Sequence, residues 1–182
     1  KAGVKKVGKH EQEGRDQAVE IALDSVADLR DFTFTAWVKP LGGASKQAVL
    51  WLGASNTKRL SFTPDDGSGN AKFSIVNCGA EQTLSAPALP IGIWTHVGIT
   101  LNGSTGALYL NGNAVASGSI TIRADQILAA NTASTPQQNY LARSQGSSMA
   151  RFRGTLDDVA FYSAALSAGD MAAWQAPTSV ET

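Results

Sequence analysis

Hydrophobic and polar residues alternate with a period of two along much of the chain. Segment 32–39 shows this most clearly, because one face of it carries only apolar side chains, namely Phe32, Phe34, Ala36 and Val38. This spacing predicts a β-strand with one face in a core, and Pro40 predicts its end. Shorter runs of the same kind predict further strands at 48–52, 59–63, 72–77, 94–101, 107–110, 114–116 and 154–162.

Turn residues separate these runs. The polar, Gly-containing segment 65–70 predicts a turn, and Asn111-Gly112 predicts a tight hairpin because both residues tolerate positive φ. Near the end of the chain, 167–174 predicts a short helix with Ser167 as its N-cap and Asp170 at the third helical position. Strands therefore dominate the predicted structure.

Many short strands joined by Gly and Asn turns are typical of an all-β, antiparallel sandwich of two sheets. The length of 182 residues fits one ordinary domain. We expect residues 1–13, which carry four lysines, to form a lead-in or linker segment, and residues 14–182 to form the sandwich domain.

Charge and composition exclude several classes of function. Fifteen basic and fifteen acidic residues give a formal net charge of zero, whereas nucleic-acid binding needs a clustered basic excess. No apolar run approaches 20 residues, so we expect no membrane span. Two histidines and one cysteine leave few groups for catalysis or zinc, and Cys78 has no partner for an internal disulfide.

Five segments, taken in order, carry a resemblance to a known family. They read GRDQAVEI (14–21), FTFTAWVKP (32–40), WTHVGIT (94–100), LYLNG (108–112) and RGTLDDVAFY (153–162). Together they resemble the laminin G-like, concanavalin A-like jelly-roll domains, in particular those attached to bacterial glycosidases and surface proteins. The likeness spans about residues 14–174. The chain departs from the family at Glu13 and Ala18, where such domains usually carry aromatic residues.

The resemblance implies two stacked antiparallel sheets, one of them concave, and a module that binds glycans or sometimes proteins. It also implies a structural calcium ion, which needs six to eight oxygen ligands. Asp16 and Asp157 match positions where related domains gather acidic oxygens. The alternative is that Asp16 caps a turn and that Asp157 accepts hydrogen bonds from loop amides.

Trp51 and Arg59 are the first candidate ligand-binding residues. Trp51 lies at the end of a predicted strand just before Gly53, and Arg59 follows across the polar loop 55–58. An indole can stack on the apolar face of a sugar while a guanidinium donates hydrogen bonds to its oxygens. The alternative is that Trp51 covers the edge of the core.

Two predicted loops supply further candidates for a binding rim. Asn77 and Glu81 flank the dipeptide Cys78-Gly79, and Arg143 and Gln145 follow the segment 140–142. Loops on a rigid sandwich commonly carry recognition, although each of these residues also fits an ordinary solvated loop. We expect Trp37 and Trp94 to be core residues, because large aromatic residues in strands usually pack, and His96 to be structural.

No pattern of catalytic carboxylates is present. Glycosidases with this fold usually carry a Glu-x-Asp-x-x-Glu sequence, which the chain lacks, and the adjacent Asp157 and Asp158 would point to opposite faces of a strand. The resemblance, together with this missing pattern, implies a non-catalytic, monomeric carbohydrate-binding module, and the zero net charge favours a neutral glycan. We expect it within a larger secreted or cell-surface bacterial protein, next to a glycoside hydrolase. The alternatives are a structural or protein-binding sandwich and, less favoured, a glycosidase or lyase.

Overall fold

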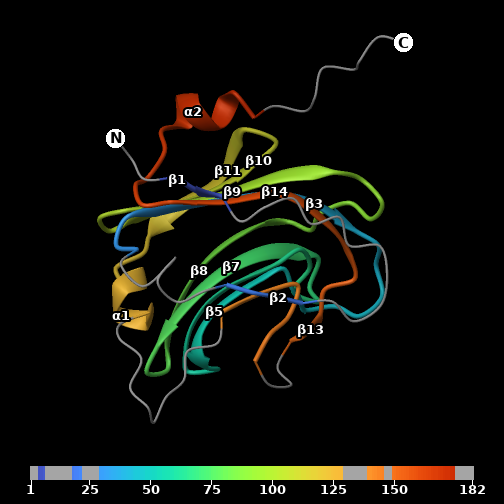
Figure 1. Ribbon diagram of the computed structural model, residues 1–182, viewed down its shortest axis with the longest axis horizontal. Coiled ribbons are helices and arrows are strands. Elements are labelled where there is room, and N and C mark those ends of the chain that lie inside the picture. The colour runs from blue at the N-terminus through green and yellow to red at the C-terminus, as the bar shows by residue number, and fades with distance from the viewer. Residues whose placement is uncertain (1–3, 7–17, 22–28, 129–138, 146–148, 175–182) are drawn as a thin grey trace.

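The computed structural model describes residues 4–6, 18–21, 29–128, 139–145 and 149–174, which form a sandwich of two six-stranded sheets (Figure 1). One of them, called the back sheet here, contains in spatial order β1 (Val4–Lys6), β14 (Gly154–Tyr162), β3 (Phe32–Pro40), β9 (Thr95–Asn102), β10 (Thr105–Leu110) and β11 (Asn113–Ser119).

The other sheet, called the front sheet here, contains the longest continuous meander of the chain. Its spatial order is β2 (Val19–Glu20), β12 (Tyr140–Leu141), β5 (Leu50–Ser55), β6 (Lys58–Thr63), β7 (Asn70–Asn77) and β8 (Ala80–Pro87). All strand pairs within the two sheets are antiparallel, which confirms the predicted fold class.

Three smaller elements complete the described structure. A parallel pair forms from β4 (Gln47–Ala48) and β13 (Ala150–Arg151), and there are two short helices, α1 (Ala124–Leu128) and α2 (Ala168–Ala172). The capping box predicted for α2 is present, because the Ser167 side chain accepts from the Asp170 N–H and the Asp170 carboxylate accepts from the Ser167 N–H.

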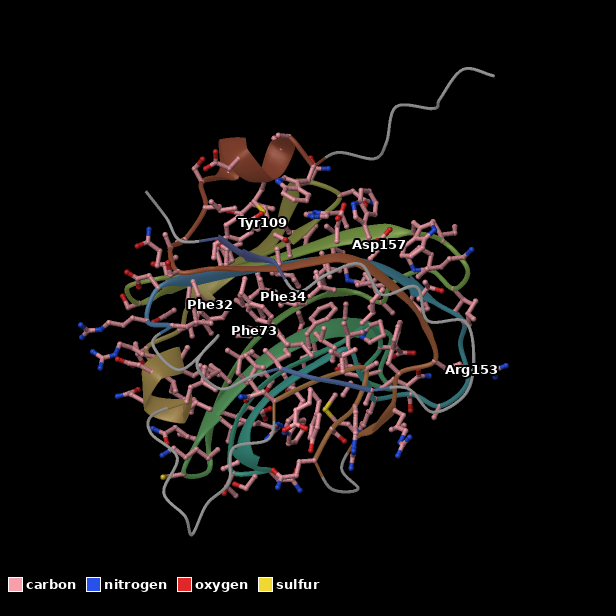
Figure 2. All side chains as sticks on the ribbon, in the orientation of Figure 1. Phe32, Phe34, Phe73, Tyr109, Arg153 and Asp157 are labelled. Atoms are coloured by element: carbon pink, nitrogen blue, oxygen red, sulfur yellow. The ribbon has the colours of Figure 1, made fainter. Side chains whose placement is uncertain are left out.

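The core lies between the two sheets. It is built from the apolar residues at every second position of the strands, as the alternating sequence pattern predicts. Phe32 and Phe34 from the back sheet and Phe73 from the front sheet project into this space (Figure 2). All three side chains are fully buried. The rings of Phe34 and Phe161, on neighbouring strands, have centroids 5.2 Å apart. Core packing of this kind fixes which face of each strand remains available to solvent.

Two segments differ from the expectation. We expected Glu81 to lie in a loop, but residues 80–87 form the edge strand β8. Cys78 and Gly79 both adopt positive φ and turn the chain back, so that β8 pairs with β7. Val4–Lys6, within the expected lead-in segment, pairs with Ala160–Tyr162 at the edge of the back sheet. These three residues are therefore part of the sandwich.

The outer face of the back sheet is covered in part by α2, which lies above that sheet in Figure 1. Met171 packs on Gly98 so closely that a Cβ at this glycine would lie 2.9 Å from the Met171 sulfur. Thr33 fixes the approach to the helix, because its hydroxyl donates to the Ala164 carbonyl and accepts from the Leu166 N–H, both at 2.8 Å. The other described helix, α1, contacts β5, β6 and β7 of the front sheet and contributes Ala124, Ile127 and Leu128 to the core.

Candidate functional site

The outer face of the front sheet carries three rows of side chains that run across its strands. Because alternate residues of each strand point to the same face, the register places Trp51 beside Ser61, Ser61 beside Ser74 and Ser74 beside Thr83. A second row places Arg59 beside Val76 and Val76 beside Glu81, and a third joins Thr63, Lys72 and Ser85. Polar and charged groups dominate these rows.

These rows form a pocket of about 370 Å³, which falls within the roughly 300–1,000 Å³ of small-molecule sites. The strands β5 and β7 arch toward the back sheet in Figure 1, so the outer face lies on the inside of the arch. Strands β6, β7 and β8 supply part of the lining of the pocket. The segments just before β4, between β6 and β7, and just before β13 supply the other lining residues. Its lining residues are Lys46, Arg59, Ser61, Thr63, Asp66, Ser68, Lys72, Ser74, Glu81 and Met149.

Glu81 connects the charged groups of this pocket. One oxygen of its carboxylate, Oε1, accepts a hydrogen bond from the Ser74 hydroxyl, lies 3.5 Å from Nη2 of Arg59 and 3.7 Å from Nζ of Lys72. Arg59 also donates from Nη1 to the Asn56 carbonyl. The network fixes both long side chains over the sheet, which lowers the entropy that a ligand would otherwise have to remove.

The protonation states of this network follow from its contacts. The Ser74 hydroxyl, and with smaller effects Lys72 and Arg59, lower the pKa of Glu81 below its ordinary value, although partial burial opposes them. Burial lowers the pKa of Arg59 below its ordinary value, and Glu81 partly offsets this effect. At neutral pH the pocket therefore contains ionised Glu81 and a charged guanidinium.

Trp51 lies beneath Arg59 and has no exposed surface. The guanidinium carbon of Arg59 stands 5.4 Å from the centroid of the indole, a cation–π distance. A sugar cannot stack on a ring that is covered in this way, so the stacking role considered for Trp51 is corrected: the indole supports Arg59 from below. Its Nε1 is buried without a hydrogen-bond partner among the described residues.

The remaining candidates lie outside the pocket lining. Arg143 stands over the ring of Tyr140 with 4.8 Å between the guanidinium carbon and the ring centroid, and Tyr140 pairs with Trp51 on the neighbouring strand. Gln145 is half-buried, and its Oε1 has no hydrogen-bond partner within the described structure. Asn77 ends β7 beside the turn to β8. Of the six predicted ligand-binding residues, the structure places Arg59 and Glu81 in the pocket.

Sequence reasoning missed the residues that make up most of the pocket, above all Ser61, Lys72 and Ser74. A signal was available, because the runs 59–63 and 72–77 alternate with the core residues Leu60, Phe62, Phe73 and Ile75. The polar residues between these positions must point to the opposite face. What the sequence alone did not show is that β8 brings Glu81 beside them.

The calcium prediction rests on two aspartates, of which Asp16 lies outside the described residues. Asp157 is half-buried beside the irregularity in β14, and its Oδ1 accepts the N–H of Asp158 at 2.8 Å. Within the described ranges no group of three or more His, Cys, Asp or Glu side chains could hold a metal ion.

The outer face of the back sheet carries an aromatic cluster. Trp37 lies edge-on to His96 with ring centroids 5.3 Å apart, and Trp174 stacks on His96 at 4.9 Å. Trp37 is half-buried on this outer face, and Trp94 is 38% exposed, so neither is part of the core between the sheets, contrary to expectation. His96 is fully buried, and neither ring nitrogen has a hydrogen-bond partner among the described residues.

Burial of His96 predicts a pH-dependent stability. Desolvation lowers the pKa of His96 from 6.5 to about 4, so the folded protein binds its proton less readily than the unfolded chain. Stability is then full above pH 6.5 and falls between pH 6.5 and 4, by about 3 kcal/mol at about 1.4 kcal/mol per pKa unit. Urea unfolding at several pH values measures this loss. His96→Phe should flatten the profile in that window, whereas a wild-type stability unchanged across it would contradict the burial of a neutral imidazole.

A two-sheet β-sandwich with a polar pocket on one outer face defines a lectin-like class of domain. A family profile described as the concanavalin A-like lectin/glucanases superfamily matches residues 13–172. The chain belongs to this superfamily. No curated protein matches the chain by sequence.

Solved structures show the same fold at low sequence identity. The IT-sialidase CBM40 of Ruminococcus gnavus bound to α2,3-sialyllactose is 16% identical, with a TM-score of 0.69 over 87% of this chain and 95% of that one. Domain 4 of AbnA, a GH43 extracellular arabinanase from Geobacillus stearothermophilus, in complex with arabinotriose, is 17% identical, with a TM-score of 0.66 over 81% and 67%.

A larger protein also contains this fold. The NanB sialidase of Streptococcus pneumoniae, as its K499G mutant, is 18% identical with a TM-score of 0.75, and the match covers 92% of this chain but 27% of the sialidase.

Among the described residues of our protein, no helix has the length and apolar character needed to cross a membrane.

Proposed function

We propose that the domain is a non-catalytic carbohydrate-binding module that holds an oligosaccharide in the pocket on the front sheet. The observation that carries the proposal is the fixed network of Arg59, Lys72, Ser74 and Glu81 at that pocket. Sugar recognition depends on hydrogen-bonding groups that are already oriented before the ligand arrives. Relatives of the same fold solved with arabinotriose and with sialyllactose support this choice of ligand class.

The state of the carboxylates supports a binding role over hydrolysis. Glycoside hydrolysis needs one carboxylic acid whose pKa is raised so that it can donate a proton. The surroundings of Glu81 instead lower its pKa. The other carboxylate of the pocket, Asp66, accepts hydrogen bonds at Oδ1 from the backbone N–H groups of Ser68 and Asn70 in its own turn. Glu81 therefore lacks the environment of a general acid.

The setting of the module is also part of the proposal. The AbnA domain and the CBM40 domain belong to proteins described as an extracellular arabinanase and a sialidase. By analogy with them, we place this domain beside a glycoside hydrolase in a secreted or cell-surface bacterial protein, where it acts as a monomeric unit of the larger chain. A binding module in that position keeps the catalytic domain near its substrate.

Isothermal titration of the purified domain against arabinan, fructan, galactan and sialylated oligosaccharides tests the proposal. We expect one member of the panel to bind, and Ser74→Ala to weaken it by about fivefold, because the hydroxyl orients Glu81 and a hydrogen bond is worth about 1 kcal/mol. Ser117→Ala, on the exposed edge strand β11, is the matched control and should bind normally. Absence of binding across the whole panel would refute a carbohydrate-binding role.

A protein-binding role is the second candidate, and an exposed apolar cluster favours it. Leu41, Ile91 and Ile93 are 49%, 69% and 58% exposed, and they gather where the Gly92 N–H donates to the Pro40 carbonyl. Trp94 adjoins them. Exposed apolar groups of this size commonly mark contact surfaces. This role becomes the leading one if the oligosaccharide panel gives no binding.

We retain a structural calcium ion as a proposal that depends on Asp16 joining Asp157. If calcium binds, the thermal unfolding midpoint should rise in millimolar CaCl₂ relative to EDTA, since a ligand that binds only the folded state stabilises it by mass action. Asp157→Asn should abolish that rise. An unchanged midpoint in wild-type protein would remove calcium from the account.

A further inference from the structure

The pocket on the front sheet has more cationic than anionic side chains in its lining. Three cations line it, Lys46, Arg59 and Lys72, against two carboxylates, Asp66 and Glu81. The chain as a whole has zero formal charge, so this excess of one positive charge is a local feature that the overall composition conceals.

One oxygen of each carboxylate already has partners within the protein. Asp66 accepts from backbone N–H groups at 2.8 and 3.3 Å and lies at a turn. Glu81 accepts from Ser74 and lies within ion-pair distance of Arg59 and Lys72. The cations of the pocket thus outnumber its carboxylates, and each carboxylate already has contacts within the protein.

Hydrogen-bond donors of the pocket, by contrast, remain available to a ligand. An ammonium group has three N–H donors, and Glu81 occupies one side of Lys72. Lys46 forms no ion pair among the described residues, and it lines the same pocket. An acceptor-only, negatively charged group satisfies such donors without supplying a proton.

We infer that the pocket selects an anionic saccharide, whose acid group takes the donors of Arg59, Lys72 and Lys46 that Glu81 leaves free. This inference rests on the proposed function and sharpens it, since the sequence alone favoured a neutral glycan. The acid group is a carboxylate or a sulfate, both of which present only acceptors to the pocket. Glu81 then acts as a positioning residue that holds Arg59 and Lys72 at a fixed separation beneath the sugar.

Paired ligands that differ only in the acid group provide the test. Titrations compare trigalacturonate with its carboxyl-reduced form, 3′-sialyllactose with lactose, and a sulfated with an unsulfated galactan oligosaccharide. We expect at least one acidic member to bind at least tenfold more tightly than its neutral partner, with an affinity that falls as NaCl is raised from about 50 to 300 mM, because salt screens exposed charges. The carboxylate and sulfate pairs show which acid group is preferred.

Substitutions test whether the preference for the acidic ligand arises in the pocket. Lys72→Ala should weaken the acidic ligand by about tenfold and weaken the neutral partner by a smaller factor, so that the preference for the acidic ligand falls. The matched control is Lys39→Ala, which removes the same charge from the back sheet and should have no effect. Circular dichroism melts of both variants verify that they fold.

The possible failures are distinguishable. Equal affinity for acidic and neutral partners would overturn the anionic selectivity while leaving the oligosaccharide-binding function in place. Acid-dependent binding that is insensitive to Lys72→Ala and Lys46→Ala would overturn the assignment to this pocket. No binding of any ligand would overturn both proposals together.

Discussion

Phe34→Ala is expected to reduce the free energy of unfolding by about 3–5 kcal/mol, the range measured for large aromatic truncations in packed cores. Phe34 has no exposed surface, sits on the central part of the back sheet opposite Ile99, and packs against the ring of Phe161. Its removal leaves a cavity between the two sheets that the surrounding strands, fixed by their hydrogen bonds, cannot close. Urea unfolding monitored by circular dichroism measures the effect.

Val115→Ala serves as the control for this core prediction. Val115 is 41% exposed on the edge strand β11, so its truncation should change stability by less than about 0.5 kcal/mol. A loss below about 1 kcal/mol for Phe34→Ala would contradict the placement of this ring in a close-packed core.

Arg59→Ala is expected to weaken oligosaccharide binding by about thirtyfold. Arg59 has two connections in the pocket, because it covers Trp51 and pairs with Glu81. The pair with Glu81 is partly exposed, and losing an interaction with a charged group in such a setting costs about 1.5–3 kcal/mol. Isothermal titration with the best ligand of the panel gives the ratio of dissociation constants.

Arg59→Lys separates charge from geometry in the same experiment. Lysine keeps the positive charge but lacks the planar group that covers Trp51 and the Nε donor, so it should recover only part of the affinity. Full recovery by lysine would show that charge alone matters, and unchanged binding in Arg59→Ala would contradict the location of the site.

The sequence predicted the fold well because the fold depends on local patterns. Alternation in β3 and β9, the Asn111-Gly112 turn and the Ser167 cap are all properties of a few neighbouring residues, and each appears in the structure. The strand β8 was missed because its sequence, AEQTLSAP, has few β-branched or aromatic residues. Its pairing with β7, which the sequence pattern does not reveal, stabilises it.

The site was predicted only in part, for a related reason. Arg59 and Glu81 were chosen for their chemistry, but they are 22 residues apart and meet only because β6, β7 and β8 pair in register. Trp51 was chosen as an exposed platform, yet its strand lies beside Arg59, whose side chain covers the indole. Which side chain covers which depends on register and rotamers, and a period of two does not contain that information.

Amide chemical-shift mapping tests the central claim most directly. In a ¹⁵N-labelled sample titrated with the tightest oligosaccharide of the panel, we predict progressive shifts in the amides of Ser61, Lys72, Ser74 and Glu81, on the three strands that form the pocket. Amides of the back sheet around Trp37 and His96 should remain in place. Shifts confined to the back sheet, or saturable binding without any change in β6, β7 or β8, would contradict the account.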